Sequence, residues 1–436
     1  MAGQLIDSKS TPTSKSEIDF FSVPSTQIAV EKSSWFVVNP QNTVTNAGPY
    51  EFHLPAEPHF LDLSKNYIHL KLRIKNANNT NIGAADVVGP INLLGKTFFK
   101  QVKLFLGSKL VYDSGDLYAY RAFLETELNY SQDQKSAFLT ATGYYLDKPP
   151  DHIDDNQNTG WQARCLPYAN SGVVELMAPL HLDLAHQEKY LINGMDLRLE
   201  LHRHDAPFAL TSYDAGADFM IVVEDIRWMV RKVDLAKPIM MAIESTLMRN
   251  VVRYPIRRVQ VKAIELSAGR RDTPINTVFS GQLPRRLIIG VVSSPAYRGN
   301  YRLGPFNFQH FNASSIQVCA GGENYPPIPI NMHYANDIYV EPFVHFHEAL
   351  GCAGSDKTPW ISYDEYKQGH CLYSFDLTPD NADTGHWELL KEGTTSIHIH
   401  FRADIPAGGA KLIVLAEFDN LMTIDRFRNV HYDFTP

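Results

Sequence analysis

The sequence has few cysteines, and it has no stretch typical of a secretory signal or of a membrane-spanning segment. It has four cysteines in 436 residues, and none forms a C-x-x-C pair. A disulfide framework or a zinc-binding cysteine site is therefore disfavoured, and we expect buried or free thiols. Residues 1–17 hold no apolar core of a secretory signal, and no apolar run approaches the roughly 18 residues that span a membrane. We expect a soluble protein that is made in the cytosol.

Catalytic motifs are also missing. The chain contains neither a G-x-S-x-G elbow nor a zincin motif. A stretch from Gly89 to Thr97 imitates a nucleotide-binding loop, but five residues separate its glycines where a Walker A loop has four. Pro90 removes one of the backbone amides that such a loop would direct at phosphate. We predict no catalytic residue, no cofactor and no metal site, and a chain that is not an enzyme.

Histidines occur in pairs two residues apart, and acidic residues gather in two loops. On a strand this spacing puts both rings on one face, as a metal site would need. His398 and His400, however, share their face with Arg402, and a neighbouring cation argues against ligation. We interpret all of these residues as surface or structural: His202/His204, His345/His347, His398/His400, Asp151/Asp154/Asp155 and Asp376/Asp380/Asp383.

The charge balance gives little sign of a nucleic-acid binder. The formal net charge is −8, whereas such proteins usually carry a basic stripe. An arginine-rich tract runs from Arg249 to Arg271. Within it Arg258, Gln260 and Lys262 alternate with apolar residues, which predicts a charged strand face. A contact of this tract with an acidic neighbour or with packaged nucleic acid is the alternative.

What the chain does contain is one stretch that occurs twice. The copies begin at Gly89 and Gly304, both with Gly-Pro-x-Asn, an offset of 304 − 89 = 215 residues. Each copy passes into an alternating strand, turns on glycine and ends in a helical pattern. Solenoid and propeller repeats are only about 20–50 residues long, so the offset indicates a duplicated domain. Since cores usually split beyond about 250–300 residues, two domains also suit the length.

The remaining pattern is typical of antiparallel sheets. In the clearest strand, Tyr67 to Lys75, Ile68, Leu70, Leu72 and Ile74 face inward. Many strands, few helices and no regular strand–helix alternation predict an all-β chain. Long excursions between strands favour jelly rolls. We predict two tandem eight-stranded jelly-roll β-sandwiches, that is, a double jelly roll with a few short helices in loops. The predicted units are a flexible N-terminal arm over residues 1–29, a first jelly roll over 30–235 and a second over 236–436.

Three segments carry further expectations. The part of the arm from Asp19 to Val30 is more apolar and is a candidate for docking on the body. Pro149 to Asn170 is polar and is predicted to be a long surface loop. Leu235 to Met248 links the halves and is apolar enough to pack. Exposed loop tryptophans such as Trp161 and Trp360 leave open a carbohydrate-binding tandem β-sandwich protein as a rival function.

Several strings resemble a known family over nearly the whole chain from about Phe20. They are GPINLLGKTFFKQVKLFLG, AYRAFLETEL, YLINGMDLRLELHR, VVRYPIRRVQVKAIELSAG, GQLPRRLIIGVV, GPFNFQHFN, YSFDLTPD and LAEFDNLMTIDRFRNV. In this order they are similar to the major capsid protein of Polinton (Maverick) elements, which are virus-like DNA transposons of eukaryotes. The Gly-Lys-Thr at residues 95–97 is not part of that pattern.

The resemblance implies a structural protein of a virion. It implies a homotrimer whose six sandwiches form a pseudo-hexagonal capsomer, and capsomers that tile an icosahedral shell. The implied partners are the chain itself, a penton or minor capsid protein at the vertices, and packaged DNA at the shell interior. No catalytic residue is carried over. A domesticated capsid gene with a host role is an alternative that the residues leave open.

Overall fold

The computed structural model describes residues 7–83, 86–214, 216–354, 358–379 and 386–432. Its first half contains two four-stranded antiparallel sheets. In hydrogen-bonded order one sheet is β1 (Val30–Val38), β10 (Phe219–Leu235), β3 (Phe60–Asn76) and β7 (Val174–Pro179). The other is β2 (Tyr50–Leu54), β8 (Leu197–Arg203), β5 (Phe99–Leu106) and β6 (Lys109–Asp113), and a short pair joins β4 (Val88–Pro90) to β9 (Leu210–Ser212).

The second half repeats this strand order. One sheet is β11 (Val252–Leu266), β18 (Ala410–Ile424), β13 (Arg286–Ser293) and β16 (Leu372–Asp376), with β19 (Val430–His431) on β18. The other is β12 (Asp272–Gln282), β17 (Glu392–Phe401), β14 (Ala313–Ala320) and β15 (Glu323–Asn331). The first strand of each half pairs with the last long strand, and the other six follow in the same order. This is the predicted double jelly roll, with eight sandwich strands in each half.

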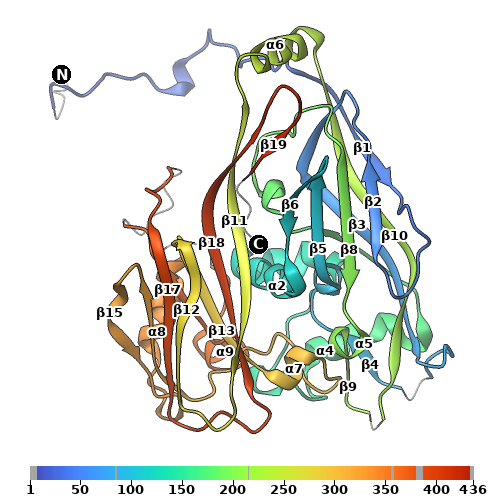
Figure 1. Ribbon diagram of the computed structural model, residues 1–436, viewed down its shortest axis with the longest axis vertical. Coiled ribbons are helices and arrows are strands. Elements are labelled where there is room, and N and C mark those ends of the chain that lie inside the picture. The colour runs from blue at the N-terminus through green and yellow to red at the C-terminus, as the bar shows by residue number, and fades with distance from the viewer. Residues whose placement is uncertain (1–6, 84–85, 215, 355–357, 380–385, 433–436) are drawn as a thin grey trace.

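Helices are short and lie mostly in the connections. The α-helices are α1 (Leu94–Thr97), α2 (Tyr118–Asn129), α3 (Gln132–Ala137), α4 (Thr159–Cys165), α5 (Ala206–Ala209), α6 (Lys237–Leu247), α7 (Ser294–Arg298), α8 (Val340–Ala349) and α9 (Tyr363–Lys367). Single turns are η1 (Ser16–Ile18), η2 (Gly115–Leu117), η3 (Phe138–Thr142), η4 (Pro150–His152), η5 (Leu166–Ser171), η6 (Asp183–His186) and η7 (Tyr334–Asn336). Figure 1 shows the sandwiches side by side, with α2 between them.

The alternating strands are built as their sequences indicate. Ile68, Leu70, Leu72 and Ile74 of β3 are each 0% exposed, and their neighbours in the chain face outward. Both repeated stretches have the same local structure, because β5 and β6 lead to α2 as β14 and β15 lead to α8. His398 and His400 lie on the solvent side of β17, and Arg402, which directly follows this strand, is exposed as well, as predicted.

Several local predictions are wrong. The stretch from Pro149 to Asn170 is not a plain surface loop, because it contains η4, α4 and most of η5. Asn158 starts α4 by accepting a hydrogen bond from the backbone N–H of Trp161 at 3.0 Å. The indole of Trp161 is then buried and donates to the Thr211 carbonyl, so this residue is not an exposed loop aromatic. Trp360 is exposed.

The arm also differs from expectation. Residues 7–28 are exposed, including Phe20 and Phe21, so the predicted docking of this segment on its own chain is wrong. The link packs, as predicted. It forms α6 at one end of the molecule (Figure 1), where Leu247 is buried and Met240 and Ile243 lie against the core. Arg258 of β11 is buried against the Phe418 ring rather than displayed on a charged face.

Three strands, β2, β12 and β15, were not predicted, and each has an identifiable reason. β2 has five residues, too few for a clear alternation. β15 contains Pro326, Pro327 and Pro329 and occupies the end of its sheet, where a strand tolerates prolines because one edge needs no backbone donors. β12 was likewise not predicted, since its sequence is largely polar.

The close packing of the second sandwich can be tested at Gly290 in β13. A methyl group added there would meet the Phe308 ring at 2.4 Å and a methyl of Leu372 at 2.7 Å. We expect Gly290→Ala to lower the free energy of unfolding by about 1–3 kcal/mol, measured as a shift of the urea midpoint. Gly83→Ala is the matched control, because its nearest atom would be 3.5 Å away. Equal midpoints for the two variants would contradict the packing described here.

Candidate functional site: the seam between the two halves

The two sandwiches meet along a seam that is apolar at its centre. On the first half, Tyr120 and Phe123 of α2 and Phe208 of α5 contribute rings. On the second half the rings are those of Tyr297, Phe306 and Phe308. Phe123 and Phe306 stack with centroids 4.3 Å apart, and Tyr120 stacks on Tyr297 at 5.8 Å. Aromatic pairs of this kind add to the hydrophobic stabilisation that their burial gives.

Charged residues of α2 are buried beside these rings. Arg121 is 1% exposed, and its guanidinium pairs with Glu125 at 2.8 Å and with Asp183 of η6 at 2.7 Å. Asp183 also accepts the backbone N–H of Val259, which belongs to β11 of the second half. The Arg121 group therefore joins α2, η6 and the other sandwich. Burial alone would raise the pKa of Glu125, but Arg121 and nearby histidines outweigh it and hold that pKa below its ordinary value.

A second buried ion pair lies further along α2 and α3. Lys135 is 0% exposed, and its ammonium donates to Glu127 at 2.7 Å and to the Pro359 carbonyl of the second half at 3.0 Å. His370 of the second half approaches Glu127 to 3.9 Å. Removing a charge from water is costly unless its partners are in place, so these contacts favour one relative position of the two sandwiches.

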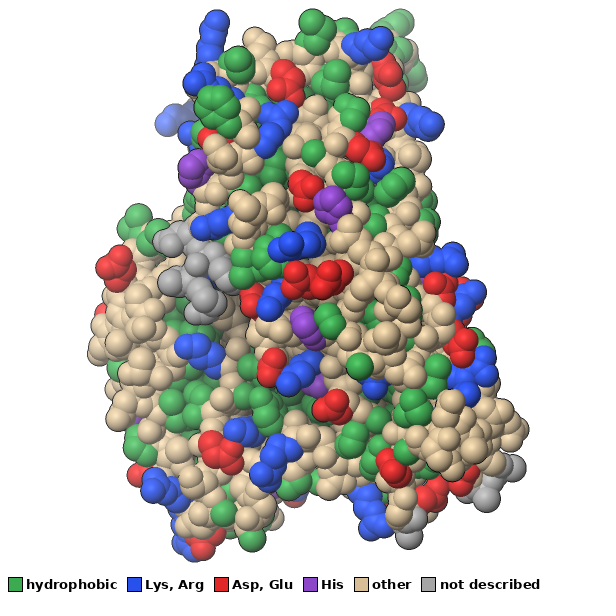
Figure 2. Space-filling view, turned by 45° about the vertical axis from the view of Figure 1, so that its right-hand side comes forward, with side chains coloured by type: hydrophobic (Ala, Val, Ile, Leu, Met, Phe, Trp, Pro, Cys, Tyr) green, Lys and Arg blue, Asp and Glu red, His purple; other side chains and the backbone are tan. Residues whose placement is uncertain are grey.

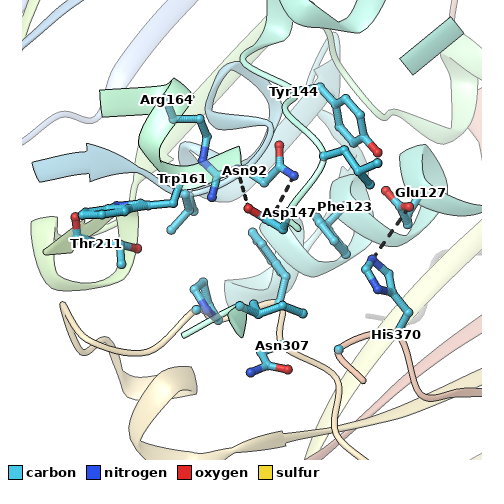
Figure 3. A pocket seen from close by; sticks show the side chains of 17 residues that line it. Asn92, Phe123, Glu127, Tyr144, Asp147, Trp161, Arg164, Thr211, Asn307 and His370 are labelled. Carbon is cyan, nitrogen blue, oxygen red and sulfur yellow. Dashed lines mark hydrogen bonds and ion pairs between the residues drawn. The ribbon is translucent and has the colours of Figure 1, made fainter. Parts of the chain in front are cut away.

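The two Gly-Pro-x-Asn sequences line one small pocket at this seam (Figure 3). Asn92 of the first copy holds the chain at Tyr145 by hydrogen bonds in both directions, at 2.8 and 3.1 Å. In the second copy the Gly304 N–H and the Asn307 amide both donate to Asp154 of the first half, at 2.6 and 2.5 Å. The cavity is about 40 Å³, enough for water but far below the size of a nucleotide or sugar site.

The residues singled out from the sequence are scattered. Lys96 is 1% exposed and donates to Thr126 at 2.8 Å, so its ammonium faces the interior, and burial lowers its pKa to about 8. Asp154 belongs to the seam, whereas Asp151 is exposed. Asp376 caps its own turn, and Asp380 and Asp383 lie outside the described residues. His204 is buried and stacks on Phe208, and His345 and His347 lie on α8.

Sequence reasoning missed the buried charges of α2. The available signal was three charged residues, Arg121, Glu125 and Glu127, in a helix with apolar residues on every side. Their partners are far away along the chain, since His181 is 56 residues from Glu125. Within the described residues, Glu125, His181 and His186 are also close enough together to hold a metal ion, with ligand atoms within 4.8 Å of one another.

The outer surface carries ion pairs and separate apolar residues. Acidic and basic side chains intermingle over the face shown in Figure 2. Exposed apolar side chains occur on the arm, on β1 and around α8 and β15; they include Phe20, Phe21, Trp35, Val37, Ile328, Val340 and Val344. All four cysteines are free thiols, as expected. Among the described residues no helix is long and apolar enough to cross a membrane.

Comparison of the structure with solved proteins identifies the class of fold. The Sputnik virophage structure determined by cryo-EM matches with a TM-score of 0.65 at 11% identity, over 100% of this chain and 96% of the matched chain. The crystal structure of the mavirus major capsid protein matches with a TM-score of 0.58 at 12% identity, over 99% and 97%. The Faustovirus major capsid protein matches with a TM-score of 0.55 at 8% identity, over 93% and 92%. The chain has the double jelly-roll fold of these viral proteins.

A relative that matches nearly the whole sequence shows which protein family the chain belongs to. Uncharacterized protein F54H12.2 of Caenorhabditis elegans is 30% identical in an alignment 424 residues long, which covers 93% of this chain and 98% of that protein. The chain belongs to the same family as this nematode protein. No family model matches the sequence.

The importance of the buried charges can be tested at Arg121. Arg121→Met leaves Glu125 and Asp183 without their shared cation in the interior. We expect the free energy of unfolding to fall by about 3–5 kcal/mol, measured by urea unfolding. Lys71→Met is the control, because Lys71 pairs with Glu175 at 3.8 Å on the exposed surface and should change little. If the Arg121→Met chain were as stable as the Lys71→Met control, the buried ion pairs of Arg121 would contribute little to the stability of the protein.

Proposed function

We propose that this chain is a major capsid protein, a structural and non-enzymatic building block of a virion. The observation that carries the proposal is the duplication of one eight-stranded sandwich within a single chain. A homotrimer of such a chain presents six sandwiches of similar shape, which fills a pseudo-hexagonal position with three subunits. The likeness of the fold to viral capsid proteins supports this proposal.

The seam suits such a building block. Domains joined by a weak interface usually move relative to each other. Here stacked rings, the Arg121 ion pairs and the Lys135–Pro359 bond cross or border the contact between the halves. We propose three units, an arm over 1–29 and jelly rolls over 30–235 and 236–436, in which the two jelly rolls move as one body.

The finer assignment is to the Polinton (Maverick) lineage. The ordered strings from GPINLLGKTFFKQVKLFLG to LAEFDNLMTIDRFRNV support it. The nematode relative fits an element carried in eukaryotic genomes. On this proposal trimers tile an icosahedral shell, a penton or minor capsid protein fills the vertices, and DNA is packaged inside. The place of action is then the virion.

The trimer can be tested by light scattering combined with negative-stain microscopy of the same sample. We expect a species of about three times 49.2 kDa with hexagonal outlines, or closed shells. The measurement should be repeated over a wide range of protein concentration, because association follows mass action. A monodisperse monomer throughout that range would overturn the proposal.

The exposed arm suggests a separate role in contacts between capsomers. Ile18, Phe20 and Phe21 are 60%, 78% and 94% exposed in the single chain, and such apolar side chains indicate a partner surface. Deleting residues 1–21, which removes these three side chains, should leave the trimer mass unchanged and lower the yield of closed shells, counted by microscopy. Replacing the same residues by a Gly/Ser segment of equal length shows whether shell formation needs the side chains of the arm or only its length. Shells formed at the wild-type yield by both variants would exclude this role.

A further inference from the structure

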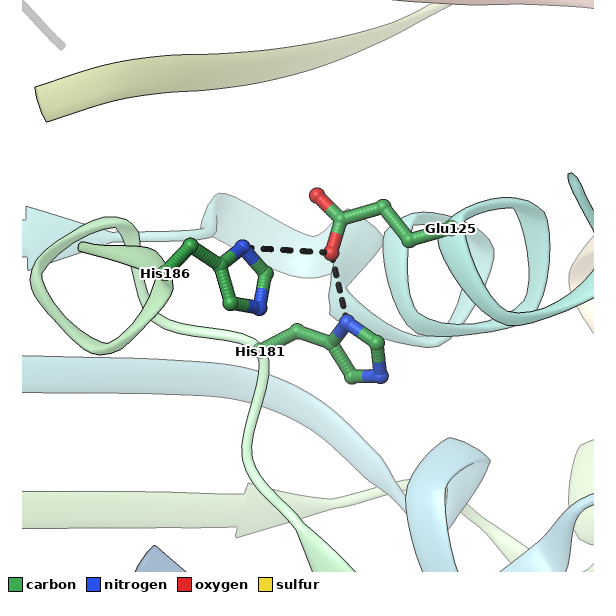
Figure 4. Close-up of side chains that lie close together, drawn as sticks. All are labelled: Glu125, His181 and His186. Carbon is green, nitrogen blue, oxygen red and sulfur yellow. Dashed lines mark hydrogen bonds and ion pairs between the residues drawn. The ribbon is translucent and has the colours of Figure 1, made fainter. Parts of the chain in front are cut away.

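Glu125, His181 and His186 converge at the wall of a cleft between the two halves (Figure 4). Glu125 comes from the middle of α2, His181 follows β7, and His186 ends η6. The Glu125 Oε2 atom lies 2.5 Å from His181 Nδ1 and 3.9 Å from His186 Nδ1. The cleft has a volume of about 980 Å³ and is lined by residues of both sandwiches.

Polar groups lie against both nitrogens of the His181 ring. The Thr126 hydroxyl donates to the Ala122 carbonyl at 2.6 Å, and Lys96 donates to the same hydroxyl at 2.8 Å. This hydroxyl lies 3.4 Å from His181 Nε2. A ring whose Nδ1 binds a metal ion carries its proton on Nε2, where the Thr126 hydroxyl can accept it.

On the other side of the ring, His181 Nδ1 and Glu125 Oε2 are 2.5 Å apart, and a shared proton or a metal ion lies between them. Both side chains are nine-tenths buried, which makes an unfilled arrangement costly.

We propose that Glu125, His181 and His186 bind a divalent zinc-type cation, with a fourth coordination position open to the cleft. Two imidazoles and one carboxylate form a donor set that zinc accepts. Ligand atoms at zinc–ligand distances of about 2.0–2.2 Å in a tetrahedron are roughly 3.4 Å apart, between the two separations observed here. Binding replaces the shared proton by the ion and draws in His186, so the proton leaves to solvent.

The neighbouring groups hold the ligands in place. Arg121 occupies the other carboxylate oxygen of Glu125 at 2.8 Å, which leaves Oε2 free for the ion. The backbone N–H of His181 donates to the Tyr118 hydroxyl at 3.0 Å, and its Nε2 faces the Thr126 hydroxyl at 3.4 Å. Lys96 lies beyond Thr126 on this side of the ring. Only His186 is half-exposed and has to move inward.

The test is a titration of the chelator-stripped full chain with ZnCl₂ and, as a coloured probe, with CoCl₂. We expect one ion per chain by calorimetry, a cobalt absorption band typical of nitrogen and oxygen ligands, and a higher midpoint of thermal unfolding with zinc. His186→Ala should weaken binding at least about 10–100-fold, and His186→Cys should retain it because thiolate also ligates zinc. His186 is half-exposed, so neither change should prevent folding.

His59→Ala is the matched control. His59 also sits between two carboxylates, Glu57 and Asp234, but among the described residues it belongs to no group of three possible metal ligands, and its loss should leave zinc binding unchanged. Absence of saturable binding by the wild-type chain would overturn the proposal. Equal affinity of His186→Ala and wild type would also overturn it, even if zinc binds elsewhere. These readouts do not involve capsid assembly, so a failed trimer test and a failed metal test are distinguishable.

Discussion

The burial of charge along α2 is the constraint on which the arrangement of the two halves depends. A sandwich core tolerates small shifts of its neighbours because apolar contacts have no strict direction, whereas a buried ion pair needs its partners at short range. Arg121 pairs with Glu125 on its own helix and with Asp183, which in turn accepts a backbone bond from the second half. The aromatic stack supplies apolar contact area, and the buried ion pairs determine how the two sandwiches are placed relative to each other.

The duplication explains why the seam can be built from one repeated sequence. Each Gly-Pro-x-Asn copy enters the strand that follows it, and each asparagine fixes a neighbouring segment through its amide. The copies are used differently, however. Asn92 binds the chain of its own half, and Asn307 reaches across to Asp154. The same short sequence therefore stabilises a local turn in the first half and connects the two halves in the second.

The sandwiches were predictable from sequence, but the seam was not. The alternation of Ile68, Leu70, Leu72 and Ile74 reports a local property, since side-chain direction in a strand follows residue spacing. The pairing of Lys135 with Pro359, or of Glu125 with His181, depends on how distant segments meet, and no spacing encodes that. The exposure of Phe20 and Phe21 and the burial of Trp161 were missed for the same reason. The sequence did show charged residues within the apolar helix α2, but it gave no indication of which residues they pair with.

The prolines of β15 limit the pairing of this sheet with a strand of another molecule. Pro326, Pro327 and Pro329 lie on the last strand of their sheet, where backbone donors would otherwise face outward. A proline has no N–H to offer, so a strand from another molecule finds an interrupted ladder at this edge. If the chain assembles as proposed, closely packed copies would therefore not extend their sheets into one another at this edge.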